Sequence, residues 1–332
     1  MTAKMWTPFF CHIEKRMYLC SVKHLFILNP DAGKKDHTAE IERQITTYSQ
    51  HIDYEIYRID GRPGTMRRYV NDYCIDHPNQ PTRFYACGGD GTLKEVASGI
   101  VGHPQAQLAC YPCGSGNDYV KYYGGQERFL NLPNLIQGTP SPVDIFHIEA
   151  QTAQGVEDHY AINIVNFGFD AAVCNTMINV RRKPIIGGRN AYTTGVVYAL
   201  MHARKNECRI EVDGQLINDA PFLLCTIAND QYVGGSYRCA PRSVNNDGVA
   251  DLCMVRPVSL LRFVTLIRAY ALGRHLDDPR FAPHIHYCRG KKFVLSNPES
   301  FWVTLDGDMI LTTHCSIEEM PQAVQFIIPK QG

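Results

Sequence analysis

The chain has 332 residues, of which 45% are hydrophobic and 20% are charged, and its 33 lysines and arginines balance its 33 aspartates and glutamates. This composition excludes a long disordered chain and leaves room for two packed domains. A net charge of zero gives no overall field that would attract nucleic acid, so we expect no nucleic-acid partner. The 13 irregularly spaced cysteines and the absence of a signal-peptide pattern indicate reduced thiols in the cytoplasm.

The first domain is predicted from strands that alternate with helices. Residues 1–22 are expected to form an N-terminal arm, and whether residues 1–16, which precede Met17, belong to the native product stays open. Residues 23–141 are expected to form the domain itself. Strands are predicted at 23–28, 52–59, 82–86 and 107–112, and helices at 38–49, 64–74 and 95–100. This alternation predicts an α/β nucleotide-binding domain built on a parallel sheet.

Glycine-bearing loops follow three of these strands. Their sequences are Asn29-Pro30-Asp31-Ala32-Gly33-Lys34, Gly88-Gly89-Asp90-Gly91-Thr92 and Gly114-Ser115-Gly116-Asn117-Asp118. Glycine lets the backbone approach an anion closely, and a helix that starts in such a loop offers free N–H groups to phosphate. Loops at the carboxyl ends of parallel strands are where open sheets bind nucleotides. Asp90 would repel phosphate there unless it assists catalysis or acts through a metal or water, and the alternative is a tight turn capped by Asp90.

The second domain is expected to be larger and rich in strands. The cluster Gly138-Thr139-Pro140-Ser141-Pro142 is predicted to form the junction, so this domain takes residues 142–332. Strands are predicted at 143–148, 159–165, 208–212, 222–228, 249–255, 292–295, 302–305 and 324–328, and helices at 191–203 and 259–272. The pattern favours an antiparallel sandwich or barrel. Whether the terminal strand, 322–330, packs back on the first domain stays open.

Taken in order, these motifs resemble the diacylglycerol kinase catalytic domain family, which includes bacterial soluble lipid kinases and the sphingosine and ceramide kinases. The family pattern is NPxxG, GGDGTxxEV, PxGTxND and DGE. The chain has Asn29-Pro30-Asp31-Ala32-Gly33, the full GGDGTLKEV, Pro112-Cys113-Gly114-Ser115-Gly116-Asn117-Asp118 and Asp306-Gly307-Asp308. The match runs from about Lys23 to Pro329. It implies an α/β domain of the NAD-kinase and diacylglycerol-kinase type, a β-rich second domain, and an active site in the cleft.

The resemblance implies that ATP is bound by residues of the three loops. They are Asn29, Gly33, Lys34, Gly88, Gly89, Gly91, Thr92, Gly114, Ser115 and Asn117. Ser115 stands where the family usually has threonine, and the change keeps the hydroxyl. The alternative for Lys34 and its neighbour Lys35 is a solvated surface pair.

The resemblance also implies a Mg²⁺ site in the second domain. Its ligands would be the Asp247 carboxylate and the carbonyls of Val244 and Val249, with Asp118 linked to the metal through water. Carboxylates and carbonyls are hard oxygen ligands that suit Mg²⁺. Without the resemblance, Asn246-Asp247-Gly248 reads as an ordinary hairpin turn.

The candidate catalytic residues are three aspartates, Asp306, Asp90 and Asp308. Asp306 follows a predicted strand and is the expected base, and a neighbouring carboxylate can raise the pKa of such a group towards a working value. Asp308 replaces a glutamate of the family with a shorter side chain, which puts its role in doubt. The alternative for Asp306-Gly307 is a plain hairpin turn.

The function that the motifs favour is transfer of the γ-phosphate of ATP, with Mg²⁺, to a lipid hydroxyl such as that of diacylglycerol. We expect a cytoplasmic protein with transient, peripheral contact at the inner membrane surface. Arg181-Arg182-Lys183 beside Pro184-Ile185-Ile186 suits such docking, and the alternative for this basic cluster is a solvated loop. Two alternatives stand beside it: an NAD kinase, which shares the GGDGT loop, and a catalytically weak lipid or nucleotide sensor. The identity of the lipid and the existence of a homodimer stay open.

Overall fold

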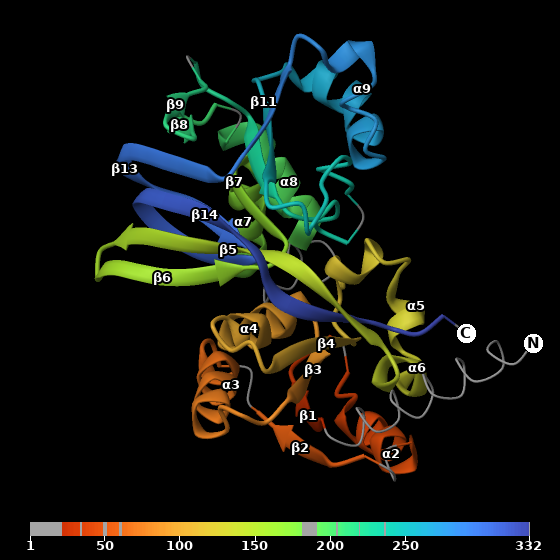
Figure 1. Cartoon of the computed structure of the whole chain (residues 1–332). Helices are drawn as coiled ribbons and strands as arrows, with labels where there is room; N and C mark the ends of the chain where they lie inside the picture. The colour runs from red at the N-terminus through yellow and green to blue at the C-terminus, as the bar shows by residue number, and fades with distance from the viewer. Residues whose placement is uncertain are drawn as a thin grey trace, which may run out of the picture. The chain divides into compact units, whose positions relative to one another are not determined.

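The computed structural model describes residues 22–33, 35–48, 52–59, 62–180, 191–203, 205–218, 220–235 and 237–331. Lys34, the basic residues 181–183 and Ile185, and the arm up to residue 21 lie outside the described residues. The chain divides into two compact units (Figure 1). Unit 1 runs to Pro142 and includes Val324–Gly332, and unit 2 is Val143–Ala323.

Unit 1 is built on a parallel sheet in the order β2-β1-β3-β4. Its strands are β1 (Lys23–Leu28), β2 (Tyr54–Arg58), β3 (Thr82–Gly88) and β4 (Ala106–Pro112). The end of β14 (Asp308–Ile328) adds a further parallel strand, with Phe326 paired to Leu108. The helices are α2 (Thr38–Tyr48), α3 (Thr65–Asp76), α4 (Asp90–Ile100), η1 (Tyr119–Lys121), α5 (Gln126–Phe129) and α6 (Leu132–Ile136).

The burial of the strands explains why the sheet is parallel and where its helices lie. Every residue of β1, β3 and β4 is buried, as expected for strands covered on both faces. The edge strand β2 has only half-buried or exposed residues. Helix α4 packs on β3 and β4, and α3 packs on α4. A Cβ at Gly99 would lie 2.7 Å from the Arg67 carbonyl oxygen, so Gly99 lets the two helices approach closely.

Unit 2 is rich in strands, and its main sheet runs in the order β12-β11-β10-β7-β13-β14 with antiparallel pairing. Its strands are β5 (Thr139–Thr152), β6 (Gly155–Ala161), β7 (Ile164–Gly168), β8 (Arg209–Val212), β9 (Gln215–Leu216), β10 (Leu224–Ala228), β11 (Ala250–Val255), β12 (Ile285–Gly290), β13 (Lys292–Leu305) and most of β14. The helices are α7 (Phe169–Val180), α8 (Ala191–His202), α9 (Leu260–Ala271) and η3 (Pro279–Phe281). No helix within the described ranges combines the length and the apolar character that crossing a bilayer requires.

Two apolar cores hold unit 2 together. The first lies among the strands and includes Phe146, Phe167 and Phe293. The second includes Phe169 of α7, Ala199 of α8 and residues of α9, so these helices cover one face of the sheet. The predicted α/β fold with a β-rich second part is therefore confirmed.

The strand boundaries differ from the prediction where the chain forms long hairpins. The predicted strands 292–295 and 302–305 are one strand, β13, whose pairing with β14 shifts register between Ser296 and Phe301. The predicted breaker cluster at Gly138–Pro142 is part of a strand from Thr139 onward. The boundary between the units thus falls inside β5, after Pro142. Proline there removes an N–H donor but does not prevent an extended backbone.

Candidate functional site

The three glycine loops of unit 1 begin at the same edge of the parallel sheet. Leu28, at the end of β1, pairs with Cys87, and Gly88 at the end of β3 pairs with Pro112 at the end of β4. Main-chain bonds continue the alignment into the loops, because Asn29 N–H donates to the Cys87 carbonyl at 3.1 Å. Parallel pairing therefore brings together loops that are distant in sequence.

Glycine is required where these loops touch. Gly33 has a φ of 77°, and a Cβ at this position would lie 2.4 Å from the Cys113 carbonyl oxygen. A Cβ at Gly114 would lie 2.3 Å from the Cα of Gly89. Both distances are shorter than side chains tolerate, so the loops meet backbone to backbone.

Side chains of the predicted site fix the loops in place. Asn29 Nδ2 donates to Thr92 Oγ1 at 2.9 Å, which ties the first loop to the second. Asn117, with a φ of 48°, accepts from Gly114 N–H through Oδ1 and donates to the Gly114 carbonyl through Nδ2, both at 3.0 Å. These residues preorganise the third loop, while Ser115 is exposed beside them.

Helix α4 presents its N-terminus in the middle of these loops. Gly89 is its N-cap and supplies no side-chain cap, and Gly91 is exposed with nothing within 4 Å of a Cβ built on it. The first N–H groups of a helix have no partner within the helix and carry partial positive charge. The site is therefore an anion cradle made of main-chain groups.

The Asp90 carboxylate binds main-chain N–H groups of the third loop and so helps to position that loop. Its Oδ1 accepts from the N–H of Asp118 at 2.7 Å and of Tyr119 at 3.4 Å, at the start of η1. Asp118 in turn accepts from Lys121 Nζ at 2.5 Å. A Cβ at Gly116 would meet Oδ2 of both Asp90 and Asp118, at 2.8 and 3.3 Å. Two carboxylates therefore converge on Gly116.

Glu95, the glutamate of GGDGTLKEV, was not singled out from the sequence. Its Oε1 accepts from Gly64 N–H at 2.5 Å and its Oε2 accepts from Arg67 N–H at 3.1 Å. Gly64 is the N-cap of α3 and has no side chain to cap that helix. Glu95 supplies the missing cap from the neighbouring helix, a contact that spacing along the chain cannot reveal.

In unit 2, Asp306-Gly307 is a two-residue hairpin turn between β13 and β14. Leu305 pairs with Asp308, and φ is 50° at Asp306 and 95° at Gly307, the pattern of a type I′ turn. Asp308 is exposed at the start of β14.

The Asp306 carboxylate also anchors a distant segment. It accepts main-chain N–H bonds from Ile162 at 2.7 Å, Asn163 at 3.1 Å and Ile164 at 2.7 Å. The Asp306 side chain therefore holds the segment that leads into β7.

The predicted metal loop is pinned by a carboxylate that the sequence did not indicate. Buried Asp144 accepts from Gly248 N–H and Gln322 N–H, each at 2.7 Å. Asp247 pairs with Arg289 and accepts from Val249 N–H at 3.4 Å. The loop with Val244, Asp247 and Val249 is thereby ordered.

A further carboxylate lies in the same part of unit 2 as the predicted metal loop. Glu319 is buried, and neither carboxylate oxygen has a hydrogen-bond partner among the described residues. Burial raises the pKa of Glu319 to about 8, and the negative charge of Asp144 adds to the shift. No set of three or more His, Cys, Asp or Glu within the described ranges is arranged to hold a metal. Mg²⁺ is commonly held by one or two carboxylates with water and carbonyls, so Asp247 and its loop suit it.

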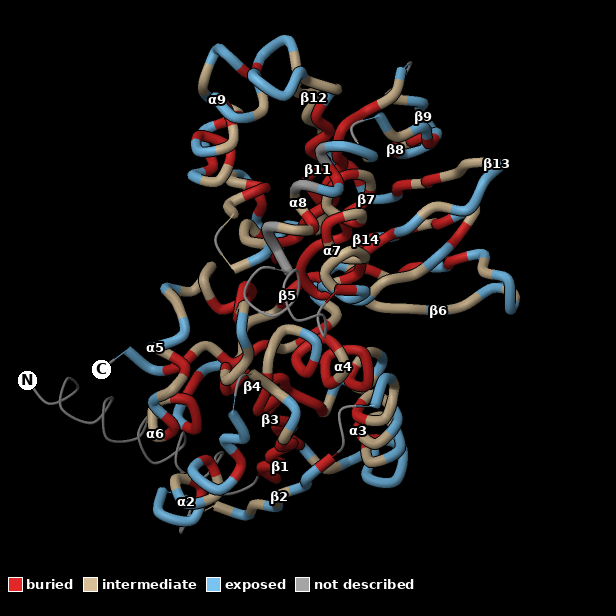
Figure 2. Tube along the Cα trace, turned by 180° about the vertical axis from the view of Figure 1, so that it is seen from behind, coloured by how far each residue is buried: buried red, intermediate tan, exposed pale blue. Residues whose placement is uncertain are grey.

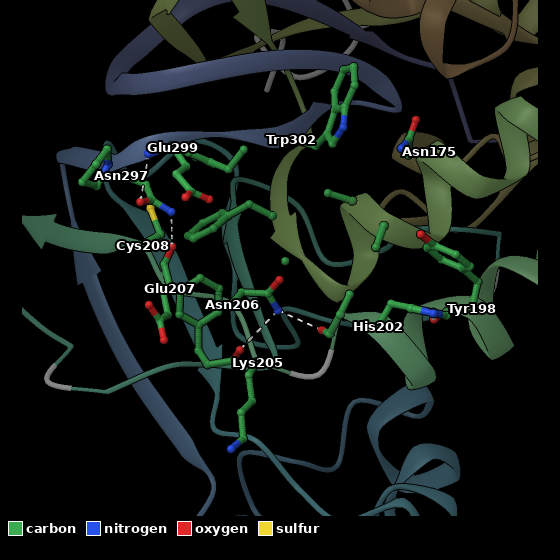
Figure 3. A pocket seen from close by; sticks show the side chains of 18 residues that line it. Asn175, Tyr198, His202, Lys205, Asn206, Glu207, Cys208, Asn297, Glu299 and Trp302 are labelled. Atoms are coloured by element: carbon green, nitrogen blue, oxygen red, sulfur yellow. Dashed lines mark hydrogen bonds between the residues drawn. The ribbon is translucent and has the colours of Figure 1, made fainter.

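Unit 2 also contains an open cavity of about 790 Å³ (Figure 3). Trp302 of β13, Asn175 of α7 and Tyr198 of α8 border it, and Asn206 holds one wall by donating to the Ala203 and Leu223 carbonyls at 2.9 and 2.8 Å. The cavity mixes aromatic surface with amide and charged groups. None of the predicted site residues lines it.

Each of the two units is similar to a known protein family. Residues 23–148 match the diacylglycerol kinase catalytic domain, and residues 163–328 match the YegS C-terminal NAD kinase beta sandwich-like domain. The chain is 30% identical to a diacylglycerol kinase of Bacillus subtilis over 74% of its own length and 77% of the relative's. The chain belongs to the diacylglycerol kinase family.

Two further proteins are similar to this chain. A Cronobacter sakazakii protein named as a YegS-like lipid kinase is 28% identical over 82% of this chain and 85% of its own. The crystal structure of a diacylglycerol kinase from Bacillus anthracis superposes with a TM-score of 0.66 at 20% identity, covering 92% of this chain and 96% of that one. The structural likeness shows a shared fold.

Proposed function

We propose that this protein is an ATP-dependent lipid kinase that transfers the γ-phosphate to a lipid hydroxyl. The observation that carries the proposal is the anion cradle of unit 1. The N-terminus of α4 has no side-chain cap and lies among three loops, and the glycines of these loops let their backbones approach closely. Phosphoryl transfer depends on positioning and charge stabilisation, and main-chain N–H groups supply both. Membership of the diacylglycerol kinase family supports a lipid as acceptor.

In the proposed complex, each loop residue has a defined task. The N–H groups around Gly89 and Gly91 bind the phosphates, and the exposed Ser115 hydroxyl donates to one of them, while the Gly114 N–H stays bonded to Asn117. Asn29 and Thr92, joined by their 2.9 Å bond, hold two of the loops at a fixed separation. Asp90 keeps the third loop in register through its bonds to the start of η1.

The proposed metal ligands are the Asp247 carboxylate and the Val244 and Val249 carbonyls, with Asp118 contributing through water. A Mg²⁺ held here would be structural, and the Mg²⁺ that neutralises charge on the phosphate oxygens would arrive with ATP. Asp144 orders the loop that presents these ligands. The orphaned carboxylate of Glu319 is a further oxygen donor in the same part of unit 2.

For the proton acceptor we propose Asp306, with Asp308 two residues further along, at the start of β14. The Asp306 carboxylate also fixes the turn by accepting three main-chain bonds. A carboxylate has about four lone-pair positions, and a substrate hydroxyl would share them with these main-chain donors. Asp308, by contrast, is exposed.

The proposed acceptor is diacylglycerol or a related lipid, met at the inner membrane surface by a peripherally bound enzyme. The names of the relatives support this substrate class. The cavity bordered by Trp302 is large enough for part of a lipid, since ligand pockets commonly span about 300–1,000 Å³.

The test is a transfer assay with γ-labelled ATP, Mg²⁺ and a panel of lipids that includes diacylglycerol, with NAD in a parallel reaction. The proposal expects label in a lipid and none in NADP. Label in NADP would select an NAD kinase instead. Nucleotide or lipid binding without any transfer would indicate a sensor. Repeating the assay with EDTA tests the metal, and transfer that persists in EDTA would contradict the Mg²⁺ requirement.

A further inference from the structure

Helix α9 of unit 2 is apolar on two opposite sides. Leu266, Ala269 and Tyr270 are buried in the core beneath the helix. Another side carries large apolar side chains that face solvent, and their exposed fractions are 51% for Leu260, 82% for Leu261, 64% for Val264 and 51% for Leu272. At 3.6 residues per turn these four positions share one face. In Figure 2 much of α9 and the turn after it is drawn as exposed.

The same segment carries only positive charge. Arg256, Arg262, Arg268 and Arg274 recur every six residues, all four are exposed, and no aspartate or glutamate lies between the first and the last. In the described part of the chain, the side chains of Arg256, Arg268 and Arg274 make no hydrogen bond or ion pair. Arg262 donates to the Arg280 carbonyl at 3.2 Å, and its charge helps to lower the pKa of Asp278.

A partner suited to this exposed apolar face and its neighbouring arginines has an apolar interior and negatively charged groups at its surface. We propose that the face formed by Leu260, Leu261, Val264 and Leu272 docks on a bilayer that contains anionic phospholipid. The leucines would enter the boundary between headgroups and acyl chains, and the arginines would meet lipid phosphates. A second copy of this chain fits less well, because Arg268 lies on the same face of α9 and an isologous contact would bring the two Arg268 side chains into one interface.

This inference rests on the proposed function, since an enzyme whose acceptor is a membrane lipid must reach the bilayer surface. It assigns that contact to α9, whereas the sequence pointed to residues 181–185. The two regions are separable, because substitutions on α9 leave that basic cluster intact.

The experiment is co-sedimentation of the full chain with vesicles of phosphatidylcholine, alone or with 30% (about one lipid in three) phosphatidylglycerol, a content chosen to give a surface potential that attracts basic segments. Wild type is expected to bind the anionic vesicles far more strongly than the neutral ones. Leu261→Ser with Val264→Ser should abolish most of this binding. Arg268→Gln with Arg274→Gln should lower the partition coefficient by roughly fivefold for each charge removed, given about 1 kcal/mol per basic residue.

Matched controls come from exposed positions away from α9. Val156 in β6 has the same 64% exposure as Val264, so Val156→Ser tests the loss of an exposed valine as such. Arg68 of α3 is likewise exposed, so Arg68→Gln tests the loss of an arginine. Both controls should bind as wild type does, and an unchanged unfolding midpoint confirms that each α9 variant is folded.

Three outcomes would overturn the proposal: α9 variants that bind anionic vesicles as wild type does, controls that lose binding equally, or a wild-type oligomer that the leucine variant dissociates. Sedimentation requires no catalysis, so it can succeed where the proposed kinase activity fails. Turnover of a short-chain diacylglycerol below its micellar concentration tests the kinase alone, and the α9 variants should keep it.

Discussion

Gly114 and Gly91 lie in neighbouring loops but have opposite surroundings. Alanine at Gly114 would place Cβ 2.3 Å from the Gly89 backbone, whereas at Gly91 it would meet nothing within 4 Å. We expect Gly114→Ala to lower the free energy of unfolding by about 1–3 kcal/mol, as overpacking does. Gly91→Ala should leave the free energy of unfolding unchanged or raise it by up to about 1 kcal/mol, because alanine favours a helix. Urea unfolding of both variants measures these free energies. Equal stability of Gly114→Ala and Gly91→Ala would contradict the close contact between Gly114 and the Gly89 backbone.

Asp306 and Asp308 lie on either side of Gly307 but differ in exposure, since Asp306 is half-buried and Asp308 is exposed. Asp306→Asn replaces a carboxylate that accepts three main-chain bonds, so we expect a loss of about 1–3 kcal/mol in stability. If Asp306 is the proton acceptor, kcat also falls by about 10²–10⁴-fold. Asp308→Asn, at an exposed position, should change stability by less than about 0.5 kcal/mol. Kinetics measured at a temperature well below the unfolding midpoint separates the loss of catalysis from the loss of stability. A wild-type kcat in Asp306→Asn would refute the assignment of Asp306 as proton acceptor.

His275 predicts a pH dependence of stability. Its ring is buried against Tyr270 and Phe281 and bonds the Cys239 carbonyl through Nε2 at 3.1 Å. Burial lowers the pKa of His275 from 6.5 to about 4. Between these values the unfolded chain binds a proton that the folded chain does not, so stability falls as the pH drops from 6.5 towards 4. The loss attributable to this residue is about 3 kcal/mol at most.

Unfolding titrations between pH 4 and 7 test this dependence, with His275→Gln as the variant. The curve for His275→Gln should be flatter than the wild-type curve over this window. The exposed His202 serves as the control, and His202→Gln should keep the wild-type slope. A slope that survives in His275→Gln would assign the dependence to other groups.

At the scale of elements, α3 depends on a cap that comes from α4. Glu95 accepts the N–H groups of Gly64 and Arg67, so Glu95→Ala should destabilise the protein by about 0.5–2 kcal/mol, the range for loss of a helix cap. Glu127→Ala, at an exposed position of α5, is the control and should be neutral. Hydrogen exchange should quicken at the start of α3 in Glu95→Ala alone. Unchanged exchange there would show that the cap is dispensable.

The elements that the sequence predicted best are those whose pattern is local. The buried runs of β1 and β3 and the helical period of α3 differ from their predicted bounds by only a few residues. Helix α4 was expected from Glu95 but begins at Asp90, because packing on β3 and β4 outweighs the poor helix propensity of Gly91. At Gly138–Pro142, β pairing likewise overrides residues that usually break strands.

At the scale of the whole molecule, motifs predicted which residues gather in unit 1 but not what their side chains do there. The loops converge because parallel strands share an edge, which the alternation of strands and helices already implied. The bonds that define unit 2 join distant positions: Asp306 reaches Ile162, 144 residues away, and Asp144 reaches Gln322, 178 residues away. No local pattern encodes such partners, so the anchoring roles of Asp306 and Asp144 emerge only from the fold.

The central claim is that nucleotide phosphates bind at the N-terminus of α4, among the glycine loops. Amide NMR of the ¹⁵N-labelled full chain, titrated with a non-hydrolysable ATP analogue and Mg²⁺, tests it directly. We predict saturable shifts of the Gly33, Gly89, Gly91 and Gly114 amides, and none at Gly155 in the β5–β6 turn. Saturable shifts that leave these four glycines unmoved would place the nucleotide elsewhere and contradict the account.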